Sequence, residues 1–501
     1  MYLDFQVNGH SNTYLPNNGS SAMASHRLSL LWLIVAAGIL SLTSLPSAHA
    51  VPSYARQTGQ QCIACHVSFP ELTPYGRYFK LTGYTIGQRQ SLPFAVMGQV
   101  GVTSTQNAHD SAGGLQVPRD GGVVFTGGSV FVAGKANDYL GGFVQWTFDN
   151  FQGGTDPDGS GHPTGGTSHS GIDNVDLRLV GKHAGPDAKE LDLIYGLTLH
   201  NNPTAQDVWN STPAFGFPFT GPPFLFIDSD NATPAALIDG SMGQHVAGMG
   251  GYFFWKKTLY GEVSFYRTAD GAFSALRAGQ DTASDQGVNR LNGYNPYWRI
   301  ALNHEWGPHS IMVGTFGMIA DKYPSNLDPT SGTDRYTDTA LDAQYQYITD
   351  PHTFTAQATY IHEKTDWNAS FPAVVATGGC GVGAGIGAGP TPCGSSSTLN
   401  TTRLKGTYYY QRKYGATAAY FQTTGGADAG LYPTLDAAGN PIFPDQRGYI
   451  LQLDYLPIQN VRLMLQYTGF LKYNGATSNY DFAGRNPRDN NQLFLNLWVA
   501  F

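Results

Sequence analysis

Segments in which apolar and polar residues alternate with a period of two recur along most of the 501-residue chain. In residues 174–180, for example, Val175 and Leu179 share one face, whereas Asp176 and Arg178 share the other. This period is typical of β-strands with one face against an apolar environment. About sixteen such strands are predicted, near residues 94–104, 121–134, 138–149, 174–183, 190–199, 243–255, 258–267, 296–306, 308–319, 335–348, 352–363, 401–412, 414–423, 446–456, 461–472 and 491–501.

The connections between these segments alternate between short and long. Short ones include 135–138, 256–258, 306–309 and 349–351. Long ones cover roughly 105–120, 150–173, 200–242, 268–295, 320–334, 364–400, 424–445 and 473–490. A transmembrane barrel has tight periplasmic turns and extended external loops, whereas a soluble sandwich has no reason for this alternation. We therefore predict an all-β transmembrane barrel of about sixteen antiparallel strands over residues 93–501, with both chain ends on the short-turn side.

Composition and the last strand agree with a barrel. The chain contains 62 Gly, 29 Tyr and 27 Phe, and only 13% of its residues are charged. After the leader, no apolar stretch is long enough for a spanning helix. Leu493, Leu495, Leu497, Val499 and Phe501 share one face of the final segment. A terminal strand that ends in Phe resembles the sorting signal of bacterial outer-membrane barrels. The bacterial outer membrane, with its lipid around the wall, is the expected location.

Residues 1–50 are predicted to be a leader. Residues 28–42 are apolar and follow Arg27, and Ser47-Ala48-His49-Ala50 contains an A-x-A cleavage pattern. These proportions fit a signal peptide if translation begins at Met23. The mature chain is then expected to begin near Val51, in an oxidising compartment where disulfides persist.

The sequence Cys62-Ile63-Ala64-Cys65-His66 is a C-x-x-C-H motif. It is the attachment site of a c-type haem: two cysteines supply thioethers, and the next residue offers an imidazole to the iron. A disulfide, a thioredoxin-like redox pair and half of a zinc site are the alternatives. A zinc site would need a second ligand pair, and a redox pair would need a βαβ frame.

Residues 51–92 form the predicted monohaem segment. So short a chain needs a staple or a partner to fold. A barrel of about sixteen strands has a lumen wide enough to accept it. We expect a small helical or irregular segment that plugs the periplasmic end of the lumen. A mobile periplasmic appendage is the alternative.

Three stretches around the motif extend the pattern: residues 52–59, the motif itself, and residues 68–80 (SFPELTPYGRYFK). Together they resemble the fused monohaem cytochrome–porin family, the outer-membrane cytochromes c of iron-oxidising bacteria, whose known members accept electrons from extracellular ferrous iron. The resemblance is specific over about 35 residues and looser over the barrel. It implies one covalent haem c, with Cys62 and Cys65 as thioether anchors and His66 as proximal ligand. Gln60 and Gln61 depart from the family, in which an aromatic residue is common before the first Cys.

Two further site predictions are less direct. Met97 opens the first strand and is a candidate sixth ligand of the haem iron. A thioether ligand would raise the reduction potential of the haem, as an oxidant of ferrous iron would require. Ordinary packing in the wall is the alternative. His109 is a weaker candidate, since it falls in the first external loop. Cys380 and Cys393 are predicted to form a loop disulfide, with two free thiols as the alternative.

The function expected from these features is oxidoreductase-like electron transfer, as an Fe(II):cytochrome c oxidoreductase. Ferrous iron would be the electron donor, a periplasmic c-type cytochrome or copper protein the acceptor, and no nucleic acid would be bound. Loop carboxylates at Asp156, Asp158, Asp228, Asp230, Asp281 and Asp285 are candidates for attracting the cation. A diffusion porin with a haem-bearing plug and a conduit for another extracellular donor are the alternatives.

The motif makes a direct prediction. Cys62→Ala or Cys65→Ala should abolish or severely reduce covalent haem, because each removes a thioether, and His66→Ala should disturb assembly by removing the proximal ligand. Haem staining of the denatured proteins is the measurement, and a colourless wild-type band would contradict the motif assignment.

Overall fold

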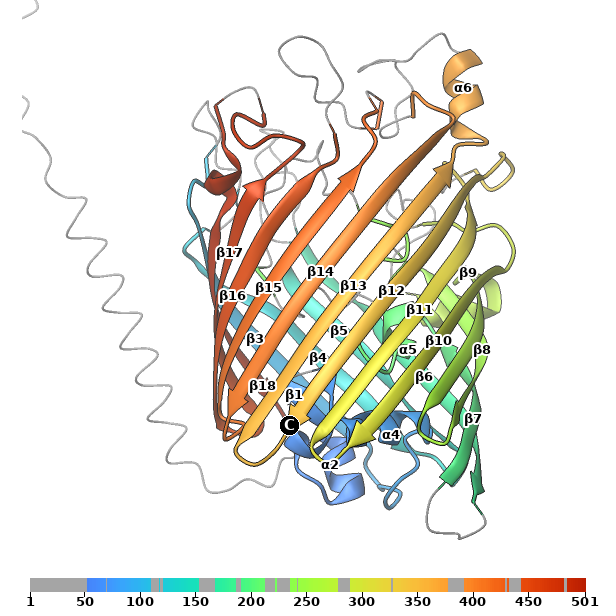
Figure 1. The fold of residues 1–501 in the computed structure, drawn as a ribbon, viewed down its shortest axis with the longest axis vertical. Helices are drawn as coiled ribbons and strands as arrows, with labels where there is room; N and C mark the ends of the chain where they lie inside the picture. The colour runs from blue at the N-terminus through green and yellow to red at the C-terminus, as the bar shows by residue number, and fades with distance from the viewer. Residues whose placement is uncertain are drawn as a thin grey trace, which may run out of the picture. The chain divides into compact units, whose positions relative to one another are not determined.

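The computed structural model describes residues 52–68, 70–109, 117, 120–152, 167–185, 191–211, 221–222, 235–240, 242–277, 289–325, 328–376, 392–428, 430–431, 443–481 and 484–501. Within these residues, sixteen strands form one closed barrel (Figure 1). They are β3 (Phe94–Thr105), β4 (Val123–Lys135), β5 (Leu140–Gln152), β6 (Thr167–Ala184), β7 (Leu191–His200), β8 (Val246–Trp255), β9 (Leu259–Thr268), β10 (Asn295–Trp306), β11 (His309–Lys322), β12 (Asp334–Ile348), β13 (His352–Asp366), β14 (Ser396–Tyr410), β15 (Tyr414–Gly425), β16 (Gln446–Ile458), β17 (Val461–Lys472) and β18 (Gln492–Ala500).

Each strand pairs antiparallel with its neighbours in sequence, and the last strand closes the barrel on the first. In that closing pair, Phe494 lies opposite Thr103 and Leu497 opposite Val100. Closure leaves no strand edge with unpaired backbone groups, as a lipid environment requires. The predicted strand number, strand order and antiparallel pairing are confirmed.

The two faces of the wall have opposite chemistry. In β16, Leu451 and Leu453 point outward and are 51% and 60% exposed, whereas Gln452 and Asp454 point inward and are buried. Leu341 of β12 also points outward and is 63% exposed. A polar interior and an apolar exterior are the reverse of a soluble protein, so this exterior faces lipid. The fold is a porin-like transmembrane barrel, and its location is the outer membrane.

Aromatic side chains gather near the short turns. Exposed ones include Tyr139, Tyr195, Trp255, Trp306 and Tyr414. Such a girdle marks the level of the lipid headgroups. Among the helices of the described residues, none is long and apolar enough to span a membrane.

The short connections are two to six residues long by the strand bounds, and the long ones are 11 to 45. In the 411–413 turn, Gln411 and Arg412 both have left-handed backbone, with φ of 51° and 54°. Two successive residues of this kind match the twist of a tight hairpin. The long connections contain the short helices α5 (Pro203–Gln206), η2 (Gly271–Leu276), α6 (Ser370–Ala376) and η3 (Pro487–Asn490).

The N-terminal segment lies at the short-turn end, beside the C-terminus (Figure 1, blue). It contains α2 (Ser53–Thr58), α3 (Cys62–Cys65), β1 (His66–Ser68), β2 (Glu71–Leu72) and α4 (Pro74–Leu81). Thr73 caps α4 by accepting the Gly76 N–H, and Pro74 occupies the first turn, where its missing N–H costs nothing. The predicted leader, residues 1–50, lies outside the described residues.

Candidate functional site

The C-x-x-C sequence forms the single helical turn α3. Cys62 is buried, Cys65 is half-buried, and the two sulfurs are not joined to each other. Residues three apart on a helix lie on the same side, which suits two thioethers on one porphyrin. Thr73 supports the turn: its hydroxyl donates to the Ala64 carbonyl at 2.6 Å, and its backbone N–H donates to the Cys65 carbonyl at 2.9 Å.

One tautomer of His66 is favoured. Its Nδ1 lies 3.3 Å from the Pro70 carbonyl oxygen. A carbonyl only accepts, so this contact favours the tautomer with the proton on Nδ1 and the lone pair on Nε2. Burial lowers the pKa of His66 to about 4, which keeps the imidazole neutral near pH 7. A neutral ring oriented through its other nitrogen is the state in which histidine binds a metal.

The two thiols do not resemble a redox pair. Burial raises the pKa of Cys62. The pKa of Cys65 is raised to about 11, mainly by burial and to a smaller extent by the neighbouring Cys62. Reactive C-x-x-C pairs have depressed thiol pKa values instead. Among the described residues, no group of three or more His, Cys, Asp or Glu side chains could hold a metal ion. The spacing of Cys62 and Cys65 on one helical turn and the Nδ1 contact of His66 are compatible with covalent haem attachment.

Gly76 allows α4 to pack against this turn. A Cβ atom at Gly76 would lie 2.2 Å from the Cys65 carbonyl oxygen, which is backbone and cannot move aside. The residue is in the first turn of α4, where glycine is otherwise unfavourable. Close packing of α4 on α3 explains its presence.

Two turns of the barrel wall hold α3 from outside the segment. The Cys62 N–H donates to Oε1 of Gln459, in the β16–β17 turn, at 3.2 Å. Arg412, in the β14–β15 turn, donates to the Ile63 carbonyl at 3.4 Å. The motif is thus fixed to the periplasmic rim of the wall.

Two charged residues of the segment reach inward-facing groups of the wall. Glu71 pairs with Lys405 of β14 at 3.0 Å, and both side chains are buried. Arg77 donates to side-chain oxygens of Ser310, Gln344 and Gln346, on β11 and β12, at 2.8, 2.9 and 2.7 Å. These contacts lie on different parts of the wall, so they fix the position of the segment.

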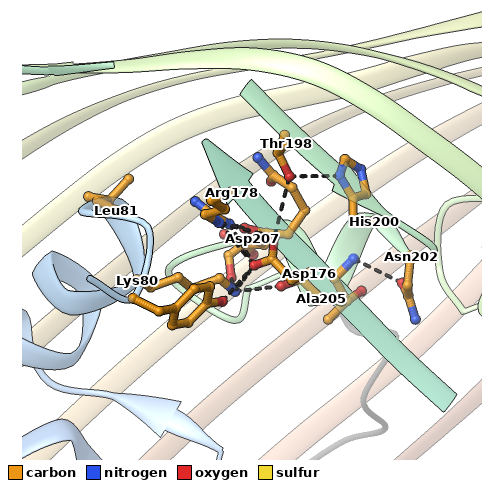
Figure 2. Close-up of polar contacts among 12 residues, drawn as sticks. Lys80, Leu81, Asp176, Arg178, Thr198, His200, Asn202, Ala205 and Asp207 are labelled. Atoms are coloured by element: carbon orange, nitrogen blue, oxygen red, sulfur yellow. Dashed lines mark hydrogen bonds and ion pairs between the residues drawn. The ribbon is translucent and has the colours of Figure 1, made fainter. Parts of the chain in front are cut away.

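A third anchor centres on Asp176 of β6 (Figure 2). Its carboxylate accepts from Arg178 Nε at 3.0 and 3.1 Å and from the Tyr84 hydroxyl at 2.6 Å, and it lies 3.9 Å from Lys80 Nζ. Lys80 also donates to the Asp207 carbonyl at 2.9 Å. Burial lowers the pKa of Lys80 to about 8, so its desolvation outweighs the attraction of the nearby carboxylates.

The end of α4 enters an apolar core inside the barrel. The Tyr252 hydroxyl donates to the Leu81 carbonyl at 2.7 Å. The core residues come from α4, the wall and the long β7–β8 connection: Leu81, Val180, Ile194, Val208, Trp209, Tyr252, Phe254, Tyr260, Ala301 and Met312. The segment therefore shares a packed interior with the wall.

Part of the β7–β8 connection also lies inside the barrel. The Trp209 carbonyl accepts from Gln344 and Gln357 at 3.0 and 2.9 Å. The Ser211 carbonyl accepts from Thr359 at 2.9 Å. These partners are inward-facing residues of β12 and β13, so this stretch lies beside the N-terminal segment within the lumen. The prediction that 200–242 is an external loop is wrong for this stretch.

A second stretch of the same connection contacts the wall further along. The Leu237 N–H donates to Glu363 at 2.5 Å, and the Ile238 N–H donates to Asp338 at 2.9 Å. Asp239 pairs with Arg403 at 2.7 Å. Residues 235–240 are thus bonded to the inner face of β12, β13 and β14.

The remaining predicted residues are placed as follows. Met97 lies on the opposite face of β3 from Phe94 and Val96, which are exposed, and is half-buried; its role as a ligand stays a prediction. Cys393 is half-buried, and its N–H donates to Asp428 at 2.9 and 3.0 Å. Cys380 and the six carboxylates predicted to attract a cation lie outside the described residues. The disulfide therefore also stays a prediction.

No family model matches this sequence, and no curated protein matches it either. Among solved structures, the chain is similar to the outer-membrane channel DcaP of Acinetobacter baumannii, with 12% identity, a TM-score of 0.38, and coverage of 81% of this chain and 96% of that one. It is also similar to OmpF of Salmonella typhi in complex with daunomycin, at 10% identity and a TM-score of 0.40 over 81% and 97% of the two chains. OccK8 (OprE) of Pseudomonas aeruginosa matches at 10% identity and a TM-score of 0.35 over 82% and 97%. Strand pairing and the two faces of the wall define the class: an outer-membrane β-barrel of the porin type.

The Glu71–Lys405 pair generates a prediction. Lys405→Met should weaken the packing of residues 52–92 against the wall by about 3–5 kcal/mol, because it leaves a buried carboxylate without its cation. The double variant E71Q/K405M should recover most of this loss of stability. Lys472→Met is the matched control, since Lys472 pairs with Asp445 at 2.6 Å in a partly exposed site.

Proteolysis of residues 52–92 in the folded barrel is the measurement, with folding checked by heat-dependent mobility on gels. Equal protease resistance in wild type and Lys405→Met would show that the pair does not hold the segment.

Proposed function

We propose that this protein carries single electrons inward across the outer membrane, from extracellular ferrous iron to a periplasmic c-type cytochrome or copper protein. The observation that carries the proposal is the C-x-x-C-H turn, which is fixed to the rim of a membrane-spanning wall with the iron-binding tautomer of His66 favoured. Bound haem c would supply a one-electron couple there.

The chain's own residues have separate tasks. Cys62 and Cys65 would attach the porphyrin, and His66 would ligate the iron through Nε2. Thr73 and the Pro70 carbonyl orient these groups. Each ferrous ion becomes ferric as one electron reaches the acceptor, so the reaction needs no proton transfer and no group transfer from these residues.

Charge supports a cationic donor on the outer side. The eight long connections contain seventeen Asp and five Arg, a net charge of −12, which is −10 without Asp207 and Asp239 inside the barrel; the whole chain has a net charge of −8. A field of one sign at a membrane surface raises the local concentration of ions of the opposite sign. Carboxylate oxygens also suit a hard metal cation. These charges favour Fe²⁺ over an anionic reductant.

The diffusion porin is the second candidate, and the contacts of chain segments with the inner wall argue against it. The N-terminal segment and residues 201–211 share a packed core inside the wall, and residues 235–240 bond to it further along. We propose that together they plug the barrel, so that electrons pass and solutes do not.

Two measurements test these proposals. When purified oxidised protein is mixed with ferrous iron, the haem α-band should appear, and it should not appear in C62A/C65A. In planar bilayers, the wild-type protein should conduct far less than an open general porin, because the proposed plug would fill its lumen. An unchanged spectrum would contradict electron transfer, and porin-like conductance would favour the diffusion alternative.

A further inference from the structure

The two ends of the barrel have opposite net charge. Residues 51–93 together with the seven short connections contain nine Lys or Arg and five Asp or Glu, a net charge of +4. The sixteen strands are balanced, with thirteen residues of each sign. The acidic excess therefore belongs to the sequence of the long connections, with fifteen Asp and five Arg when Asp207 and Asp239, which lie inside the barrel, are left out. The periplasmic end is cationic on a chain that is acidic as a whole.

One of these cations, Arg412, contacts the C-x-x-C-H turn, and Lys413 is next to it in sequence. Arg412 is placed by the tight hairpin turn of β14–β15, and its guanidinium bonds to the Ile63 carbonyl, between the two cysteines in sequence. Lys413 follows it, and its Nζ lies 5.9 Å and 5.7 Å from the ring centres of Tyr414 and Tyr455. Arg412 is therefore held beside the expected haem, and Lys413 lies at the level of the aromatic girdle.

Acidic groups do not cancel this pair. The neighbouring β12–β13 turn contains one, Asp350, and is joined to the β14–β15 turn by a hydrogen bond from the Gln411 N–H to the Pro351 carbonyl at 2.6 Å. The other turn that contacts α3, at 459–460, contains Gln and Asn. The rim next to the motif therefore keeps a positive charge.

Lys256 and Lys257 form the β8–β9 turn, on another part of the rim. The Nζ of Lys256 lies 5.3 Å from the ring centre of Trp255, a girdle residue that is 46% exposed on the lipid side. This position suits a headgroup contact. Lys256 and Lys257 form a turn with the same left-handed backbone as the 411–413 turn, with φ of 49° and 54°. They provide a control that matches the Arg412–Lys413 pair in charge and backbone, at a turn that lines a pocket with Tyr75 and Tyr78 of α4.

We propose that the rim formed by Arg412 and Lys413 is the docking surface for the electron acceptor, and that this acceptor is a small soluble protein with an acidic face around its redox centre. The inference rests on the proposed function for the identity of the partner as an electron acceptor. Opposite charges at an interface accelerate encounter and orient the partner. Arg412 would bring the acidic face against the turn that carries the haem.

The first test is binding and needs no electron transfer. The full chain in nanodiscs of zwitterionic phosphatidylcholine is titrated with a polyglutamate peptide at about 20 mM and about 300 mM salt, which span weak and strong screening. Binding should be seen at low salt and be lost at high salt. The variant R412E/K413E should bind about tenfold more weakly, R412Q/K413Q should fall between, and K256E/K257E should bind nearly as well as wild type.

The second test uses inorganic acceptors. Protein reduced with dithionite is mixed with ferricyanide or with tris(phenanthroline)cobalt(III), each of which takes one electron from the haem iron. R412E/K413E should slow oxidation by the anionic ferricyanide about tenfold at low salt and speed oxidation by the cationic cobalt complex. K256E/K257E should change neither rate by as much. Gel mobility before and after heating checks that every variant is folded.

Three outcomes would overturn the proposal. Equal losses in R412E/K413E and K256E/K257E would mean a diffuse charge effect, and no loss in either would mean that the rim is not a docking surface. Phosphatidylglycerol can also be added to the nanodiscs. If it abolishes polyglutamate binding by the wild type and leaves binding by the variants unchanged, the rim would be assigned to lipid headgroups. Failure of ferrous iron to reduce the haem would overturn the proposed function and leave the binding result unaffected.

Discussion

The lipid bilayer cannot hydrogen-bond to a polypeptide backbone, and most of this structure depends on that constraint. Pairing of β18 with β3 closes the ladder of backbone hydrogen bonds. Closure sends alternate side chains inward, and many of those side chains are charged or carry amides and hydroxyls. A polar lumen of sixteen strands can stay filled with water or accept other parts of the chain. Here the N-terminal segment and stretches of the β7–β8 connection contact the inner wall.

Ion pairs buried in this interior define where the segment lies. Burial of a charge is costly unless a partner of opposite sign is in place, so each pair favours one position of the segment over others. Lys405 is 334 residues from Glu71 in sequence, and Asp176 is 96 residues from Lys80. The wall thus determines the position of the C-x-x-C-H turn, and through it the position that haem would take relative to the membrane and the periplasm.

The sequence predicted the strands well because their alternation follows directly from a wall with two different faces. Prediction from the sequence was less accurate where apolar and polar residues do not alternate. Strand β6 begins at Thr167, seven residues before the predicted start. The alternation did not reveal these seven residues because Thr167–Asp173 contains few apolar residues. The inward path of residues 201–211 could not be predicted, since it depends on hydrogen bonds to Gln and Thr side chains of distant strands. The only hint of this inward path in the sequence was the apolar Val208-Trp209 pair within an otherwise polar stretch. The haem site remains a prediction from the spacing of Cys62, Cys65 and His66, whereas the role of Gly76 depends on a close approach that spacing does not reveal.

The central proposal is that a haem held at the rim of a plugged barrel would link two compartments. The most direct measurement uses proteoliposomes that hold a trapped acceptor, with the long connections facing outward and ferrous iron supplied outside. The account predicts that the acceptor is reduced while the vesicles remain impermeable to small solutes, and that C62A/C65A vesicles show no reduction. Reduction that requires permeabilised vesicles, or that proceeds equally in C62A/C65A, would contradict it.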